Sequence, residues 1–214
     1  FVINLLNFWP NKKDELILFV NSNHPGLKNL KLLLRKKIVS VFDHQLGMGG
    51  MMSEKDLNNY LISFFNISKK FKNINFIFKS KFTSMIFNKI LEKIKLTNSI
   101  KKNFYILTDS DIEAYELMAI SDMVISFPHS SIIDEALTCN IKTIIYDPYN
   151  RYSSKNFWYN KIPNLRINSR NELIKKIEYL YKNKTSDKIN IQYAKLMDIN
   201  LRQNYIDKIL KELK

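Results

Sequence analysis

Residues 129–135 carry the side chains of this sequence that are best suited to hold an anionic ligand. They read H-S-S-I-I-D-E, with adjacent hydroxyls at Ser130 and Ser131 and a carboxylate at Glu135. If a helix begins at the serines, its first backbone amides and the two hydroxyls can bind phosphate oxygens. Glu135, one turn later, can then accept hydrogen bonds from vicinal hydroxyls such as those of a ribose. For the pattern taken alone, the simpler interpretation is that the serines cap the helix and that the acid interacts favourably with the positive end of the helix dipole.

The surrounding residues, 121–148, are predicted to form a strand, a tight loop, a helix and a second strand. Residues 123–127 and 142–146 are short apolar runs rich in β-favouring side chains, which is typical of strands buried on both faces of a parallel sheet. Pro128 ends the first strand, and a serine caps the helix that follows. A crossover of this kind places its loop at the carboxyl edge of the sheet, where open α/β folds usually bind ligands.

Strands alternate with helices through most of the chain, which predicts an α/β fold built on a doubly wound parallel sheet. The predicted strands are residues 15–20, 38–42, 74–79, 104–107, 123–127, 142–146 and, at a sheet edge, 165–167. The predicted helices are residues 27–35, 53–70, 82–95, 112–120, 171–181 and 199–213, besides the one that begins at the serines.

Composition excludes several classes of protein. Of the 214 residues, 45% are hydrophobic and 25% are charged, which indicates a globular protein. No apolar run approaches the roughly 20 residues that a transmembrane helix needs, and the single cysteine, Cys139, favours a reducing, cytoplasmic compartment. The formal charge of +14 favours anionic ligands. Because the basic residues are dispersed and no nucleic-acid recognition motif is present, we expect no nucleic-acid partner.

A second candidate phosphate-binding loop lies at residues 43–50. Gly47, Gly49 and Gly50, three of the four glycines in the chain, fall there between a predicted strand and a predicted helix. A glycine-rich loop in this position can present backbone amides to a phosphate. The pattern matches neither the dinucleotide fingerprint nor the P-loop, so a loop that is simply flexible explains it equally well.

Three stretches of the chain are similar to a known family. They read D-I-E-A-Y-E-L-M-A-I-S-D-M-V-I-S from residue 111, S-S-I-I-D-E-A-L from residue 130 and I-K-T-I-I-Y-D-P from residue 141. In these stretches, and from about residue 38 to 180, the chain resembles the carboxyl-terminal, donor-binding domain of GT-B glycosyltransferases. The resemblance is to bacterial surface-polysaccharide enzymes and their CDP-glycerol glycerophosphotransferase and UDP-N-acetylglucosamine 2-epimerase relatives. It implies a Rossmann-like domain that binds a nucleotide-sugar.

The resemblance implies roles for single residues. In such enzymes serines meet the donor phosphates and a glutamate meets the nucleotide ribose, and these roles fall on Ser130, Ser131 and Glu135. His129 stands where small residues are frequent, and it can either touch a phosphate or shape the loop. Many relatives carry Lys-x-His-Pro after the second strand, where this chain reads F-K-S-K-F. Lys79 is therefore only a candidate phosphate contact.

Two loops also gain expected roles from the resemblance. The loop after the first strand of such domains borders the donor, which suggests phosphate contacts from Gly49 and Gly50. The loop before the helix that starts D-I-E-A-Y commonly frames the base. This suggests that Asp109 and Ile112 lie near the ribose or the base.

The implied chemistry is glycosyl transfer from a nucleotide-activated donor, with the leaving phosphate stabilised by helix amides and hydroxyls. We see no His/Cys cluster with metal spacing. We therefore expect neither a metal nor a tightly bound cofactor, and the nucleotide-sugar is a substrate. GT-B enzymes commonly place the catalytic base and the acceptor pocket in their amino-terminal domain, so we expect an incomplete active site here and assign no catalytic residue.

This interpretation divides the chain into a remnant of a preceding domain or connector (1–36), a Rossmann-like nucleotide-sugar-binding domain (37–198) and a carboxyl-terminal helix (199–214). The chain has no initiator Met and no signal-peptide pattern, and we expect it to begin inside a longer protein. The expected acceptor is a glycan or a lipid-linked glycan. Basic helices at 27–35 and 199–214 can rest on the anionic inner face of a membrane or can simply pack with solvated lysines.

Three other functions are compatible with the same fold. They are transfer of a polyol phosphate from a CDP-polyol, epimerisation of a nucleotide-sugar, and nucleotide-sugar binding without catalysis. Turnover by the full-length protein distinguishes the last of these from an enzyme.

Overall fold

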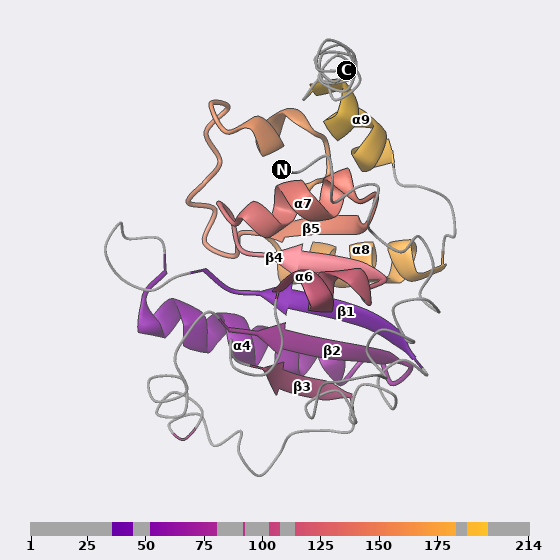
Figure 1. The fold of residues 1–214 in the computed structure, drawn as a ribbon. Helices are drawn as coiled ribbons and strands as arrows, with labels where there is room; N and C mark the ends of the chain where they lie inside the picture. The colour runs from indigo at the N-terminus through magenta and orange to yellow at the C-terminus, as the bar shows by residue number, and fades with distance from the viewer. Residues whose placement is uncertain are drawn as a thin grey trace, which may run out of the picture.

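The structure is a computed structural model that describes residues 36–44, 52–80, 92, 103–107, 114–182 and 188–196. The strands in these ranges are β1 (Lys37–Phe42), β2 (Ile74–Lys79), β3 (Phe104–Leu107), β4 (Met123–Ser126), β5 (Lys142–Tyr146) and β6 (Arg166–Ile167). The helices are α4 (Glu54–Ser68), α6 (Ala114–Ala119), α7 (Ser131–Thr138), α8 (Arg170–Lys182) and α9 (Lys188–Leu196), with a 3-10 turn, η2 (Trp158–Lys161). Figure 1 shows their arrangement. The predicted elements at 15–20, 27–35, 82–95 (apart from residue 92) and 199–213 lie outside the described residues.

The described strands form one parallel sheet with the order β3-β2-β1-β4-β5-β6. This is the order of doubly wound dinucleotide-binding sheets, so the predicted fold class is confirmed. β6 lies at an edge, as predicted. From β1 the chain adds β2 and β3 toward one edge of the sheet, and it then returns to add β4, β5 and β6 on the other side of β1. The connections that follow β1 and β4 therefore leave toward opposite faces of the sheet. We call the place between these two strands the switch point.

Helices cover both faces of the sheet because the strands are apolar on both faces. On one face, strand residues such as Val41 form a single apolar cluster with α4 and α8. On the other face, residues such as Phe42 cluster with α6, α7 and α9. In Figure 1, α6 and α7 lie in front of the sheet, and α4 and α8 lie behind it. Burial on both sides explains why the strands are continuous apolar runs in the sequence.

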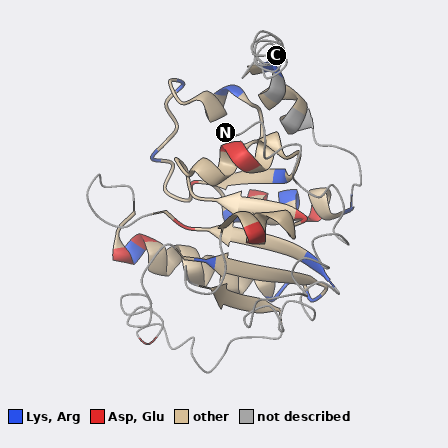
Figure 2. Ribbon diagram, viewed as in Figure 1, with Lys and Arg blue, Asp and Glu red and all other residues tan. Residues whose placement is uncertain are grey.

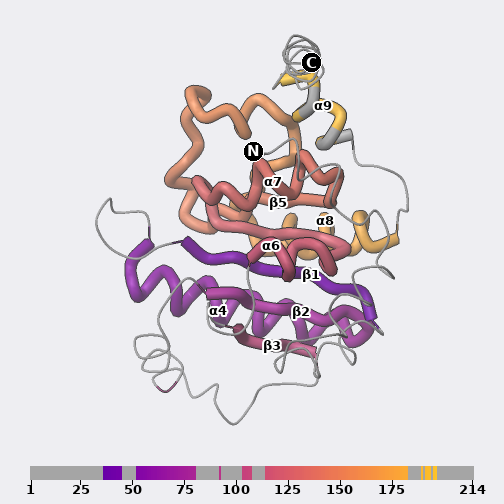
Figure 3. The backbone as a smooth tube through the Cα atoms, in the orientation of Figure 1, coloured from indigo at the N-terminus to yellow at the C-terminus, as the bar shows by residue number. Residues whose placement is uncertain are grey.

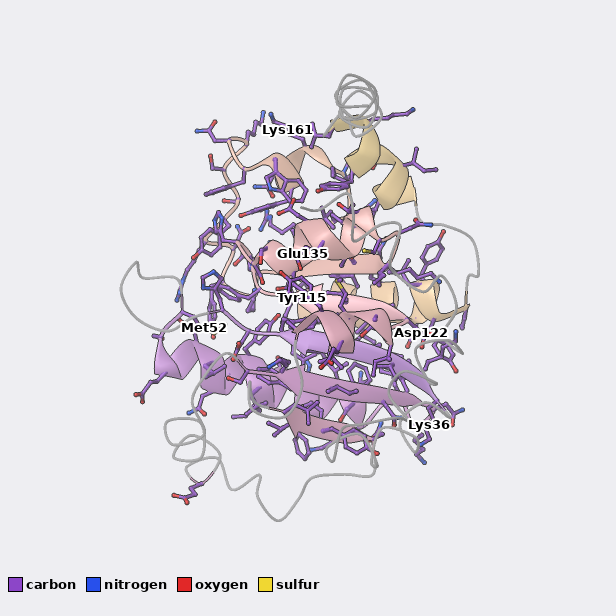
Figure 4. All side chains as sticks on the ribbon, viewed as in Figure 1. Lys36, Met52, Tyr115, Asp122, Glu135 and Lys161 are labelled. Atoms are coloured by element: carbon purple, nitrogen blue, oxygen red, sulfur yellow. The ribbon has the colours of Figure 1, made fainter. Side chains whose placement is uncertain are left out.

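Asp122, which directly precedes β4, fixes the amino edge of the sheet. Its carboxylate accepts a hydrogen bond from the backbone N–H of Ile38 at 2.8 Å and another from Nζ of Lys37 at 2.8 Å. Both donors belong to the start of β1, so the carboxylate holds β1 and β4 in register. Figure 4 labels Asp122 at this edge and Met52 toward the opposite, carboxyl edge.

The first turn of α4 is fixed at the carboxyl edge. Ser53 Oγ accepts a hydrogen bond from the Asp56 N–H at 3.1 Å, and Asp56 Oδ2 accepts one from the Ser53 N–H at 3.0 Å. This capping box confirms the predicted helix start. Arg151, from the connection after β5, donates two further hydrogen bonds to Asp56 at 2.9 and 3.1 Å. Burial raises the pKa of Asp56, but the hydrogen bonds from Arg151 and Ser53 outweigh it and leave that pKa lowered.

Two described elements, η2 and α9, were not predicted from the sequence. Figure 3 follows the chain, in orange, from the end of β5 round to η2, whose Tyr159 is 2% exposed. On α9, Ile189 and Tyr193 are one turn apart and are buried in the cluster that includes α7. The Tyr193 hydroxyl also donates a hydrogen bond to Asp134 Oδ1 at 3.1 Å. Contacts with α7 therefore hold α9 in place, and η2 packs into the same cluster, where Trp158 lies against Tyr193 of α9.

Replacement of Asp56 by Ala is expected to lower the free energy of unfolding by about 1–2 kcal/mol, because the capping box and both Arg151 hydrogen bonds are lost. Urea denaturation at neutral pH measures this change. Glu54→Ala removes an exposed acid from the same first turn and should cost less than about 0.5 kcal/mol. Equal losses for the two variants would contradict the assignment of Asp56 as the anchor of α4.

Candidate functional site

The loop between β4 and α7 lies at the switch point in a constrained backbone conformation. The Phe127 N–H donates a hydrogen bond to the Phe42 carbonyl at 3.1 Å, which keeps the loop against the end of β1. His129 has a φ of 63°, in the left-handed region that residues other than glycine seldom occupy. Ser130 then takes the N-cap position, and α7 begins at Ser131. The loop therefore presents the start of α7 at the carboxyl edge of the sheet.

Ser130 does not cap α7 with its side chain. We predicted that Ser130 or Ser131 caps this helix, and Ser130 occupies the N-cap position, but its hydroxyl makes no capping hydrogen bond. The residue is 4% exposed, and within the part of the chain that the structure describes its Oγ has no hydrogen-bond partner. A buried hydroxyl in this state costs about 1–3 kcal/mol. An anion bound at the helix start would accept a hydrogen bond from it, beside the N–H groups of the first turn.

Glu135 lies one turn into α7, next to Tyr115 of α6. The Tyr115 hydroxyl donates a long hydrogen bond to Glu135 Oε1 at 3.4 Å, and Figure 4 labels the two residues on neighbouring helices. Glu135 is half-buried, whereas Tyr115 is 45% exposed. Because α6 starts at the carboxyl edge, this exposed ring lies on the ligand side. Tyr115 was not among the predicted site residues, although a tyrosine in the first turn of a helix on that edge is a usable signal.

The side chain of His129 lies in a cage of aromatic rings. Its ring centroid is 4.6 Å from those of Tyr152 and Phe157 and 5.7 Å from that of Tyr159, all edge-to-face. The Tyr159 hydroxyl is 3.3 Å from Nε2 of His129. On the backbone side, His44 Nε2 donates a hydrogen bond to the His129 carbonyl at 3.1 Å. Burial, and then the neighbouring His44, lower the pKa of His129.

Lys79 lies apart from the start of α7. It is the last residue of β2 and is 2% exposed, and β1 separates β2 from β4, which corresponds to about 10 Å between the strand axes. At the end of β1, the fully buried Asp43 accepts a hydrogen bond from Ser80 Oγ at 2.6 Å. This buried pair between the ends of β1 and β2 was not predicted from the sequence.

The structure thus brings some of the predicted site residues together and separates one from the rest. The residues gathered at the start of α7 are His129, Ser130, Ser131 and Glu135. Lys79 is two strands away from β4. The other predicted site residues lie outside the described residues, and they are Gly49, Gly50, Asp109 and Ile112.

Charge is dispersed over the described elements. Figure 2 shows lysines and arginines on the start of β1, on β5, on α8 and on the connection after β5. Within the described ranges, no group of three or more His, Cys, Asp or Glu residues is placed to hold a metal ion. None of the helices in those ranges combines the length and the apolar composition needed to cross a membrane.

The fold and the position of α7 define a doubly wound α/β domain whose helix start lies at the switch point. The chain belongs to the family of polysaccharide biosynthesis PFTS motif proteins, whose model matches residues 27–177, more than half of the chain. Two tetrapeptides of the chain come near to the letters in that name: residues 81–84 read K-F-T-S, and residues 128–131 read P-H-S-S. No curated protein matches the sequence.

Solved structures share the fold. A candidate UDP-N-acetylglucosamine 2-epimerase from Listeria monocytogenes is 14% identical, with a TM-score of 0.54 over 83% of this chain and 45% of its own. The S. aureus MnaA–UDP structure is 12% identical, with a TM-score of 0.51 over 78% of this chain and 42% of its own. A UDP-forming α,α-trehalose-phosphate synthase from Burkholderia xenovorans is 11% identical, with a TM-score of 0.54 over 89% of this chain and 46% of its own.

These likenesses show the fold alone, and they confirm the predicted Rossmann-like α/β fold. The chain spans less than half the length of each of the three structures.

Ser130→Ala should not lower the free energy of unfolding and should raise it, by up to about 1–3 kcal/mol, because no described hydrogen bond is lost and a buried hydroxyl without a described partner is removed. The matched control is Ser53→Ala, which deletes a hydroxyl that does make the cap hydrogen bond and should cost about 1 kcal/mol. Denaturant titrations of the two variants give the comparison. A Ser130→Ala loss as large as that of Ser53→Ala would show that Ser130 serves stability.

Proposed function

We propose that this chain is the donor-binding part of a glycosyltransferase that moves a sugar from a nucleotide-activated donor in polysaccharide biosynthesis. The observation that carries the proposal is the buried Ser130 hydroxyl, which lacks a partner among the described residues, at the start of α7. That helix start lies at the switch point, where doubly wound folds bind ligands. Membership of a polysaccharide-biosynthesis family and a fold shared with a UDP-forming synthase support the choice of reaction.

The start of α7 holds the donor diphosphate in this proposal. The backbone N–H groups of Ser131 and Ile132 belong to the first turn, and the hydroxyls of Ser130 and Ser131 stand beside them. Negative charge grows on the phosphate as the bond to the sugar breaks. Fixed amide dipoles and hydroxyl donors at that position stabilise the charge and so assist departure of the nucleotide.

The nucleoside lies over α6 and α7. Glu135 accepts hydrogen bonds from the vicinal hydroxyls of the ribose, and the Tyr115 hydroxyl, 3.4 Å from its Oε1, orients the carboxylate. The exposed ring of Tyr115 offers a flat apolar surface to the ribose or the base. The spacing of one helical turn between Ser131 and Glu135 matches a ligand whose phosphates lie at the helix start and whose sugar ring lies further along.

The acceptor side of the reaction is proposed to lie outside the described residues. The chain spans less than half of each structural neighbour, and the described part of the site contains groups that bind a donor but no assigned group that activates an acceptor. We therefore place the catalytic base and the glycan or lipid-linked acceptor elsewhere in the complete protein. Transfer releases the nucleotide and lengthens an acceptor, whereas epimerisation of the donor does neither, so analysis of the products separates these two reactions.

Glu135→Ala is expected to weaken UDP binding about tenfold, since hydrogen bonds to a charged group contribute about 1.5–3 kcal/mol, and to leave pyrophosphate binding unchanged. Calorimetric titration with UDP, CDP, GDP and pyrophosphate measures both effects and identifies the preferred base. Glu172→Ala, which removes an exposed acid from the first turn of α8, is the control and should bind all four ligands as the wild type does. Equal UDP affinities for wild type and Glu135→Ala would remove the ribose role.

A further inference from the structure

His129 joins three connections at the carboxyl edge of the sheet. It belongs to the loop after β4, and its carbonyl accepts the hydrogen bond from His44 in the connection after β1, at 3.1 Å. Its ring packs at 4.6 Å against both Tyr152 and Phe157, which belong to the connection after β5. We call residues 149–161, which make up most of that last connection, the aromatic strap.

The aromatic strap has internal contacts that do not depend on His129. The rings of Phe157 and Tyr159 stack with their centroids 5.5 Å apart. The Tyr152 N–H donates a hydrogen bond to Asp147 Oδ2 at 3.0 Å, which fixes the strap to the end of β5. The strap is therefore a formed surface against which the ring of residue 129 packs.

The letters in the name of the family can be compared with this loop. Its letters P-F-T-S can be set against residues 128–131, which read P-H-S-S. In this comparison the first and last residues are identical, the third keeps its hydroxyl, and the second keeps a flat ring. The other similar tetrapeptide, K-F-T-S at 81–84, is identical at the last three positions but lacks the proline, and it lies outside the described residues. A phenylalanine in the second position cannot bind phosphate, but it packs well edge-to-face in an aromatic cage.

We propose that residues 128–131 are this chain's form of the motif after which the family is named, and that the second residue, His129, is an aromatic anchor that couples the strap to the phosphate-binding loop. His129 is then a positioning residue and not a phosphate ligand. The inference rests on the proposed function, because the loop that it positions is the one that holds the donor phosphates. Loss of the ring lets the loop move, and Ser130 and the first turn of α7 lose their binding geometry.

The two roles of His129 predict opposite effects of pH. Burial, and then His44, lower the pKa of His129, while Asp147 acts in the opposite direction, and the hydroxyl groups of Tyr152 and Tyr159 are the other titratable groups on the rings of the cage. The folded state therefore favours the neutral ring, so acid loosens the anchor and weakens phosphate binding. An imidazole that contacted the phosphate would bind it more tightly when protonated.

The test compares wild type, His129→Phe and His129→Ala in calorimetric titrations with inorganic pyrophosphate and with UDP. At about pH 7.5, His129→Phe should bind pyrophosphate within about twofold of the wild type, and His129→Ala about tenfold more weakly, because only the first keeps a ring in the cage. Between about pH 7.5 and about pH 5, a range that passes below the ordinary histidine pKa, the wild type should weaken relative to His129→Phe. The ratio of the two affinities cancels the titration of the ligand itself.

Three results would overturn the anchor while the proposed function stands. If His129→Phe binds pyrophosphate as weakly as His129→Ala does, His129 is a phosphate ligand. The same conclusion follows if the wild type binds pyrophosphate more tightly relative to His129→Phe in acid. Equal binding by all three proteins shows that the ring does not position the loop. If instead the wild type binds neither ligand, or if Ser130→Ala binds as well as wild type, the proposed function fails and the inference fails with it. Thermal denaturation checks that each variant is folded.

Discussion

The reversal of strand order between β1 and β4 is the constraint on which the rest of the structure depends. In a parallel sheet every strand ends at the same edge, and the connections that leave neighbouring strands toward opposite faces cannot cover the edge between them. Here the connection after β4 enters α7 on one face, and α4 packs on the other. The start of α7 therefore lies where backbone amides can meet a ligand. Asp122 maintains this arrangement from the opposite edge, since it ties the starts of β1 and β4 together.

Ser130 and Ser53 show how the same residue type can serve two purposes. Both occupy N-cap positions, but the Ser53 hydroxyl completes a capping box, whereas the Ser130 hydroxyl is buried and makes no capping hydrogen bond. The first contributes to stability, and the second costs stability unless a ligand accepts its hydrogen bond. The same loop contains His129, whose φ of 63° is a strained backbone conformation for a residue other than glycine. Costs of this kind persist where neighbouring contacts impose them, and here the cage of Tyr152, Phe157 and Tyr159 does so.

The sheet could be predicted from the sequence because its strands are buried on both faces and therefore appear as short apolar runs between helical segments. β4, β5 and the capping box of α4 follow directly from local residue patterns. The grouping of His129, Ser130, Ser131 and Glu135 was predictable for the same reason, since one loop and one helix carry all of them. η2 and α9 were not, because each is held by contacts with residues that are distant in sequence.

The properties that distinguish the site residues from one another are also non-local. No sequence pattern shows that the Ser130 hydroxyl makes no capping hydrogen bond, that Tyr115 reaches Glu135, or that a ring at position 129 packs on a connection that starts about twenty residues later. Lys79 was a candidate because it ends a strand at the same edge of the sheet. The strand order separates it from α7.

The central claim is that the start of α7 holds a diphosphate through the Ser130 hydroxyl and the first-turn amides. The affinity of Ser130→Ala for inorganic pyrophosphate, compared with that of the wild type, tests it most directly, because this ligand carries no base or sugar. We predict a loss of about tenfold, the usual size of a lost hydrogen bond to a charged group. Unchanged affinity in the folded variant would contradict the claim.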